Sequence, residues 1–184
     1  MENIDIIKIE KHLMDNIKPI NFYVDMKNIK YKNFSKNENM GIYVFWYNNE
    51  LNKIKELYRD LIIEGPNGSK ENIQWDWNMD NKYLCLYVGK TRDFQKRISQ
   101  HLLLKTENLK NIDGNKLNKK TTACQLRSGF DYLYSKNNDV NIKNELQKTI
   151  FLSLYYENDF IKRFYIEDYL IGKLKPWFNV DSER

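Results

Sequence analysis

Two side chains that suit phosphate chemistry, Arg97 and His101, lie four residues apart in a segment with helical periodicity. Residues at this spacing share one face of a helix, about one turn apart. The arginine fork can bind two phosphate oxygens without losing its charge, and the histidine can accept a proton or orient a tyrosine. Each also has a structural interpretation, because an arginine can form an exposed salt bridge and a lone helical histidine is usually part of the packing. The spacing alone leaves both interpretations open.

Two tyrosines lie in short apolar segments upstream: Gly41-Ile42-Tyr43 begins one, and Tyr87-Val88-Gly89 ends the other. A phenol with a pKa near 10 is mostly protonated at neutral pH, so it can act as a base only where nearby cations lower its pKa. Lys90 and Arg97 are candidates for that effect. Gly89, which we expect to follow the strand, would let the backbone and Lys90 approach a ligand closely. The chain has 13 tyrosines, so core packing is the competing explanation for either one.

Taken together, these residues resemble the signature of the GIY-YIG nuclease family. Gly41-Ile42-Tyr43 matches the first half of the name, and Tyr87-Val88-Gly89 matches the second half with valine in place of isoleucine. The helical arginine and histidine of the family fall on Arg97 and His101. The downstream matches, in the order of the family, are Glu167, Leu170-Ile171, Pro176 and Asn179.

The resemblance implies an endonuclease that hydrolyses phosphodiester bonds with a divalent cation. It implies Glu167 as the metal ligand, with Mg²⁺ as the cation and Mn²⁺ as a substitute; a lone carboxylate suits Mg²⁺ because it leaves coordination sites to water and phosphate. It also implies Tyr43 as the general base and Tyr87 as the residue that positions water or phosphate. The other expected site residues stabilise charge, transfer a proton or brace the site: Lys90, Arg97, His101 and Asn179. The expected contacts to the nucleic acid are Lys90, Arg92, Lys96, Arg97 and Lys105.

The layout favours a stand-alone, restriction-type member of the family. Homing endonucleases of this type carry DNA-binding modules after the nuclease domain, whereas five residues follow Asn179 here. We therefore expect cleavage of double-stranded DNA, for which a homodimer is suited because one site cuts one strand at a time. The alternatives are a structure-selective repair or recombination nuclease, and an inactive protein of the same fold that binds nucleic acid.

The two halves of the motif usually lie close together in this family, but here the two tyrosines are 44 residues apart. We therefore expect an insertion at about 48–82, which contains Trp75-Asp76-Trp77. These indole rings could stack on bases or wedge a duplex, or they could pack the insertion against the core. The expected domain organisation is an N-terminal extension over residues 1–39 and a nuclease domain over residues 40–184.

Hydrophobic periodicity predicts the elements that would position these residues. The predicted helices cover residues 4–17, about 51–62, 93–104, 122–134 and 159–175, and the predicted strands cover 40–47, 83–88 and 149–155. Strand alternation would place Tyr83, Cys85 and Tyr87 on one face and Leu84, Leu86 and Val88 on the other. Residues 20–40 are expected to be loop with one short strand, and 105–120 a loop. This order predicts an α+β fold: a small three-stranded mixed or antiparallel sheet flanked by helices, with an inserted helical segment.

Charge and composition narrow the class of protein. The net charge is +5, and residues 84–184 hold 18 basic and 12 acidic side chains, a local charge of +6 that would attract a polyanion. A lysine-rich solvated surface is the competing explanation. No uncharged apolar run approaches the roughly 20 residues of a membrane span, so we expect a soluble, cytoplasmic protein. Cys85 and Cys124 have no Cys or His nearby, which excludes a disulfide framework or zinc site by sequence pattern.

Overall fold

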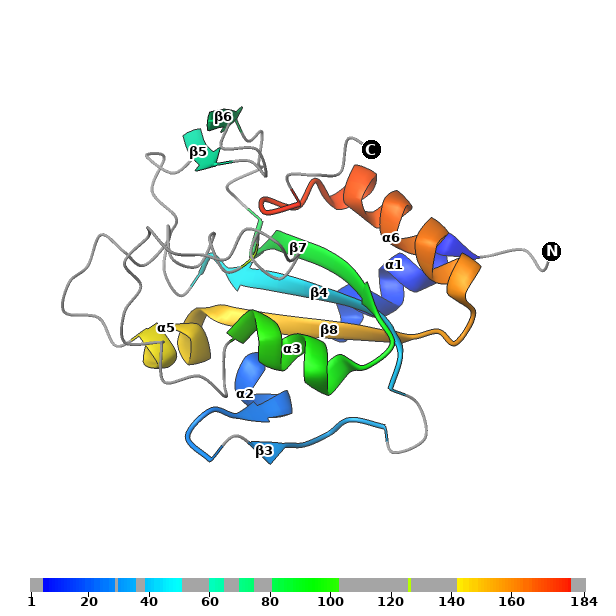
Figure 1. Cartoon of the computed structure of the whole chain (residues 1–184), viewed down its shortest axis with the longest axis horizontal. Coiled ribbons are helices and arrows are strands. Elements are labelled where there is room, and N and C mark those ends of the chain that lie inside the picture. The colour runs from blue at the N-terminus through cyan, green and yellow to red at the C-terminus, as the bar shows by residue number, and fades with distance from the viewer. Residues whose placement is uncertain are drawn as a thin grey trace.

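A four-stranded antiparallel sheet forms the centre of the computed structural model (Figure 1). The structure describes residues 5–28, 30–35, 39–50, 60–64, 70–74, 81–102, 126 and 142–179. The strands, in spatial order, are β1 (Lys18–Pro19), β8 (Ile150–Tyr156), β4 (Gly41–Asn48) and β7 (Tyr83–Thr91). The three long strands confirm the predicted sheet and its antiparallel form. The short β1 adds a fourth strand at the outer edge of β8.

Helices cover both faces of this sheet, as Figure 1 shows. The helices are α1 (Ile6–Asp15) and α6 (Phe160–Leu174) on one face, and α2 (Ile20–Tyr23), α3 (Phe94–Leu102) and α5 (Ile142–Thr149) on the other. All eight residues of β4 are buried, because this central strand has a helical layer on each side. The predicted α+β class is therefore confirmed.

Two apolar clusters fill the spaces between the sheet and its helices. Ile42, Val44 and Trp46 of β4 pack with residues of α1 and α6 on one face. Tyr43 and Phe45 pack with residues of α2, α3 and α5 on the other. This alternation follows from the period of two in a strand. It gives Tyr43 and Phe45 fixed positions on the face that α3 covers.

Aspartates begin the two helices that carry the proposed site residues. Asp93 Oδ1 accepts a hydrogen bond from Lys96 N at 2.9 Å at the start of α3. Asp159 Oδ1 accepts from two backbone N–H groups at the start of α6, at 2.8 and 3.0 Å. The helix α6 ends at Leu174, two residues before Pro176, and its C-cap residue has a φ of 45°. Both predicted helix starts and the predicted stop before the proline are confirmed.

Three local predictions were wrong or incomplete. Residues 60–62, predicted as the end of a helix, belong to the strand β5 (Asp60–Glu64), which pairs with β6 (Lys70–Gln74). The β-branched pair Ile62-Ile63 and the Gly-Pro-Asn-Gly segment that follows suit a hairpin better than a helix end. Residues 20–35 contain α2 and a second hairpin, β2 (Val24–Asp25) with β3 (Lys30–Tyr31), where one short strand was expected. The sequence analysis also missed α5, which has few apolar residues to reveal its period.

Other predictions lie outside the described residues: the rest of the inserted helix at 51–59, the loop at 105–120, and Trp75 and Trp77. Of the helix predicted over 122–134, only Leu126 is described, and it is helical and buried. In the described part of the chain, no helix combines the length and the apolar character that crossing a membrane requires.

Candidate active site

A β-bulge in β7 sets the direction of Tyr87. Phe45 pairs with Tyr87 and the next residue, Trp46, pairs with Cys85, so Leu86 is an extra residue in β7. Beyond it the alternation is reversed: Tyr87 joins the cluster beneath α3, and Val88 joins the cluster beneath α6. The prediction that Tyr87 shares a face with Cys85 was therefore wrong. Because of this one extra residue, Tyr87 faces the same side of the sheet as Tyr43.

The Tyr43 hydroxyl lies at the centre of a buried polar network. Arg97 Nε donates a hydrogen bond to Tyr43 Oη at 3.1 Å, and His101 Nε2 lies 2.8 Å from the same oxygen. Since Arg97 Nε can only donate, Tyr43 Oη accepts from it, and the phenol can donate its own proton to His101 Nε2 when that nitrogen carries no hydrogen. The ring of Tyr87 is stacked on that of Tyr43, with centroids 6.1 Å apart. The structure thus brings together four of the predicted site residues, from β4, β7 and α3.

Gly89 makes room for the Tyr43 ring. It lies within β7 rather than after the strand, and it pairs with Tyr43 of β4. A Cβ atom at Gly89 would lie 2.3 Å from Tyr43 Oη and 2.4 Å from Tyr43 Cζ. The missing side chain is therefore needed for a buried phenol, a role that the sequence analysis did not predict, and the prediction that Gly89 follows the strand was wrong.

We expect Gly89→Ala to lower the free energy of unfolding by about 1–3 kcal/mol, because the methyl group forces Tyr43 to move in a packed core. The same displacement would lower nuclease activity. Gly172→Ala is the matched control, since a Cβ there meets nothing within 4 Å in α6. That change is expected to stabilise the protein by about 1 kcal/mol. Denaturant unfolding of both variants measures the difference, and equal midpoints for Gly89→Ala and wild type would contradict the steric role.

A second group of residues occupies the free edge of β7. Glu167 of α6 accepts a hydrogen bond from Lys90 N at 3.0 Å through Oε1, and Lys90 Nζ forms an ion pair with Glu167 Oε2. The Asn179 side chain pairs with the backbone of Val88 in both directions, with N···O distances of 2.8 Å. Glu167 and Asn179 thus take the place of a neighbouring strand. The roles predicted for Lys90, as support for an anion of the reaction, and for Asn179, as a brace, stay predictions; the observed contacts are the Lys90–Glu167 ion pair and the pairing of Asn179 with Val88.

The pKa of Tyr43 is raised well above the ordinary value for a phenol, first because the side chain is buried and then because Tyr87 lies beside it. The charge of Arg97 and its hydrogen bond act in the opposite direction, and Glu167 raises the pKa further. Burial likewise raises the pKa of Tyr87. We expected nearby cations, a metal ion among them, to lower the pKa of Tyr43; of these, Arg97 acts in that direction, and burial outweighs it. Tyr43 is therefore a protonated phenol at neutral pH.

The surroundings of Glu167 fit a divalent cation held by one protein carboxylate. Its Oε2 already contacts a positive charge, the Lys90 ammonium, and its side chain is 13% exposed. In the described ranges, no group of three or more His, Cys, Asp and Glu side chains could hold a metal ion. A lone carboxylate leaves the remaining coordination positions to water and phosphate oxygens, as suits Mg²⁺. Glu167 is the residue that would hold the cation.

The structure describes two of the other three basic residues that were predicted to contact the nucleic acid. Arg92 and Lys96 are exposed beside the start of α3, and Lys105 lies outside the described residues. The sequence analysis missed Phe160 and Phe164, which precede Glu167 by seven and three residues on α6. Aromatic residues at this spacing share a helix face with Glu167, and that spacing is the signal that could have revealed them.

Comparison with known proteins identifies the family. The family model of the GIY-YIG catalytic domain matches residues 76–179, which is more than half of the 184 residues. No curated protein and no solved structure gives a significant match. The matched segment begins after β4, but the structure places Gly41, Ile42 and Tyr43 opposite Thr91, Lys90 and Gly89. Both halves of the motif thus lie side by side, and the chain belongs to the GIY-YIG nuclease family, as an endonuclease that hydrolyses phosphodiester bonds of nucleic acid.

Proposed function

We propose that this endonuclease uses Mg²⁺, or Mn²⁺ in its place, to cut double-stranded DNA at defined sequences, as restriction enzymes do. The chemical part of the proposal rests on one observation. Tyr43 Oη lies 3.1 Å from Arg97 Nε and 2.8 Å from His101 Nε2, so a cationic donor and a proton acceptor share one phenol oxygen. Members of the family generally use a divalent metal.

In the proposed mechanism, Tyr43 transfers a proton rather than storing a negative charge. The attacking water gives a proton to Tyr43 Oη while the phenol proton passes to His101 Nε2. This relay follows from the raised pKa of Tyr43, since a preformed phenolate would be rare at neutral pH. Tyr87, stacked beside Tyr43, would orient the water or the phosphate.

Arg97 and a cation held by Glu167 would stabilise the negative charge of the phosphate. The guanidinium of Arg97 can bind two phosphoryl oxygens and stabilise the charge that develops on them. A divalent cation on Glu167 would supply Lewis-acid polarisation of the phosphoryl group. Lys90 would leave Glu167 Oε2 and contact the phosphate instead. Asn179 would keep the edge of β7 in place during these changes.

Sequence-specific cleavage is supported by the elements added around the nuclease sheet. The hairpin of β5 and β6 lies in the chain between the two halves of the motif, and α1 packs with α6 in one cluster. Additions of this kind give a compact nuclease extra surface with which to read base edges.

The proposal is tested by incubating the purified protein with supercoiled and linear DNA from several sources, with Mg²⁺ or with EDTA. We expect discrete fragments with Mg²⁺ and none with EDTA. The Arg97→Ala variant, purified in the same way, controls for contaminating nucleases. Smeared products or nicking alone, with preferential cleavage of flapped DNA, would contradict sequence-specific cleavage and favour a repair nuclease. No cleavage of any DNA would contradict the proposed activity itself.

A further inference from the structure

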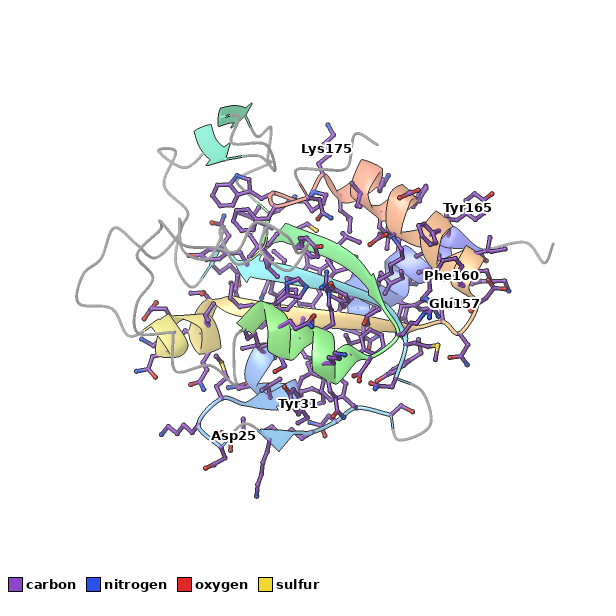
Figure 2. All side chains as sticks on the ribbon, viewed as in Figure 1. Asp25, Tyr31, Glu157, Phe160, Tyr165 and Lys175 are labelled. Carbon is purple, nitrogen blue, oxygen red and sulfur yellow. The ribbon has the colours of Figure 1, made fainter. Side chains whose placement is uncertain are left out.

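Two exposed phenylalanines extend the active site along α6. Phe160, Phe164 and Glu167 have the spacing of one helix face, and the phenylalanine rings are 51% and 40% exposed. Their ring centroids are 4.8 Å apart in an edge-to-face arrangement. Figure 2 shows Phe160 at the start of α6, on the outer surface of the molecule. We call these two residues the aromatic pair.

Each ring of the aromatic pair has a cation against it. Lys90 Nζ lies 3.8 Å from the ring centroid of Phe164 and also contacts Glu167, so this lysine joins the aromatic pair to the carboxylate. Arg92 Cζ lies 5.6 Å from the ring centroid of Phe160. Such contacts hold flexible cations in place over the rings. The surface next to Glu167 therefore combines partly exposed aromatic rings with positive charge.

This combination suits a nucleotide of the strand that is being cut. We propose that the aromatic pair stacks with an unpaired nucleobase next to the cleaved bond, while Arg92 and Lys90 neutralise the adjacent phosphates. A base can stack on an aromatic ring only when it is not enclosed in a duplex, and such stacking is tolerant of sequence. The inference rests on the proposed function in taking DNA as the nucleic acid, and it requires the base next to the cleaved bond to leave the duplex.

A second copy of the chain would fit this surface less well. A protein partner that covered Phe164 would also cover Lys90 and Glu167, and it would block the site. Such a partner would have to remove water from the charged groups of Lys90 and Arg92, which costs free energy unless the partner supplies anions. A DNA strand supplies such anions in its phosphates. The other exposed apolar residues of α6, Ile161, Tyr165 and Tyr169, are turned away from Glu167 by their helical positions. They provide the internal control.

The experiment uses DNA duplexes that end either blunt or in a short single-stranded overhang with 2-aminopurine. Binding is measured in EDTA, so that no strand is cut. With the wild-type protein we expect tighter binding of the overhang and a change in 2-aminopurine fluorescence on stacking. The double variant Phe160→Ala, Phe164→Ala should lose the fluorescence change and bind the overhang about tenfold more weakly. Phe160→Leu, Phe164→Leu should lose the fluorescence change too, because it keeps apolar bulk but no π-face.

Tyr165→Ala is the matched control on the same helix, where the side chain is 57% exposed, and it should behave as wild type. An unchanged fluorescence response in the double variant would overturn the proposal. An equal loss of the fluorescence change in Tyr165→Ala would also overturn it. So would sedimentation that shows a dimer for the wild-type protein and a monomer for the double variant, because that result would assign the surface to a second copy of the chain. This experiment measures binding without cleavage, so its result is independent of the digestion test. The fluorescence change can be absent although the enzyme cuts DNA into discrete fragments, and it can be present although no DNA is cut.

Discussion

Replacing Arg97 by alanine is expected to lower the rate of DNA cleavage about 10⁴-fold, the scale known for an arginine that stabilises a phosphoryl transition state. Two losses combine in this variant. The phosphate loses its bidentate cationic partner, and Tyr43 Oη loses the donor that lies 3.1 Å away. Burial and Glu167 then raise the pKa of Tyr43 with less opposition. Single-turnover cleavage with enzyme in excess measures the chemical step directly.

Lys96→Ala provides the comparison for Arg97→Ala, since Lys96 is an exposed cation on the same helix. It should change the cleavage rate only slightly at saturating enzyme. Both variants should still bind DNA, with a modest weakening that shrinks as salt increases. If Arg97→Ala cleaved at more than a hundredth of the wild-type rate, Arg97 would not be part of the reacting group.

Tyr43→Phe is expected to lower the single-turnover rate about 10³-fold, within the range for loss of a general base. The ring is kept, so the packing of Tyr43 against Tyr87 and His101 should remain. Tyr155→Phe, in the cluster on the opposite face of the sheet, should leave the rate unchanged. A Tyr43→Phe variant as active as the wild type would exclude the phenol from proton transfer.

The pH dependence of the wild-type enzyme separates the relay from a preformed phenolate. The raised pKa of Tyr43 keeps the phenolate fraction small below pH 10, and that fraction grows tenfold for each pH unit. A mechanism that needs preformed phenolate therefore predicts a tenfold rate increase from pH 8 to pH 9. The relay predicts a much smaller increase over this interval.

The raised pKa of Tyr43 also makes the stability of the folded protein depend on pH above pH 10. The unfolded phenol releases its proton near pH 10, whereas folded Tyr43 releases it at higher pH, so the folded state binds more protons and stability falls as pH rises above 10. Tyr43→Phe removes this contribution and should lose less stability there. Unfolding curves near pH 7 and above pH 10 measure both values in the same samples.

The sequence predicted correctly those features that depend on the type of a few neighbouring residues, such as the start or end of a helix or strand. The strand from Gly41, the caps Asp93 and Asp159 and the stop before Pro176 follow from local chemistry, and each was predicted. Arg97 and His101 were placed on one helix face by spacing alone. The site was recognisable because these local signals occur in a fixed order along the chain.

What escaped prediction depends on contacts between distant segments. The bulge at Leu86 leaves no mark in the pattern of β7, yet it decides which face receives Tyr87. The pKa of Tyr43 could not be given the right direction, because its burial depends on α3 packing over β4. The first residues of β5 were mistaken for the end of a helix because Leu61 and Ile62 fit either period.

The covered edge of β7 also bears on how the protein avoids self-association. An edge strand with unpaired N–H and C=O groups invites pairing with another chain and so promotes aggregation. In this protein, Glu167, Asn179 and the backbone N–H groups of Trp177 and Phe178 bond to that edge. Two of these groups also belong to the proposed active site. A change that removes them would therefore expose a template for intermolecular strand addition, so the side chains proposed for catalysis also shield this edge.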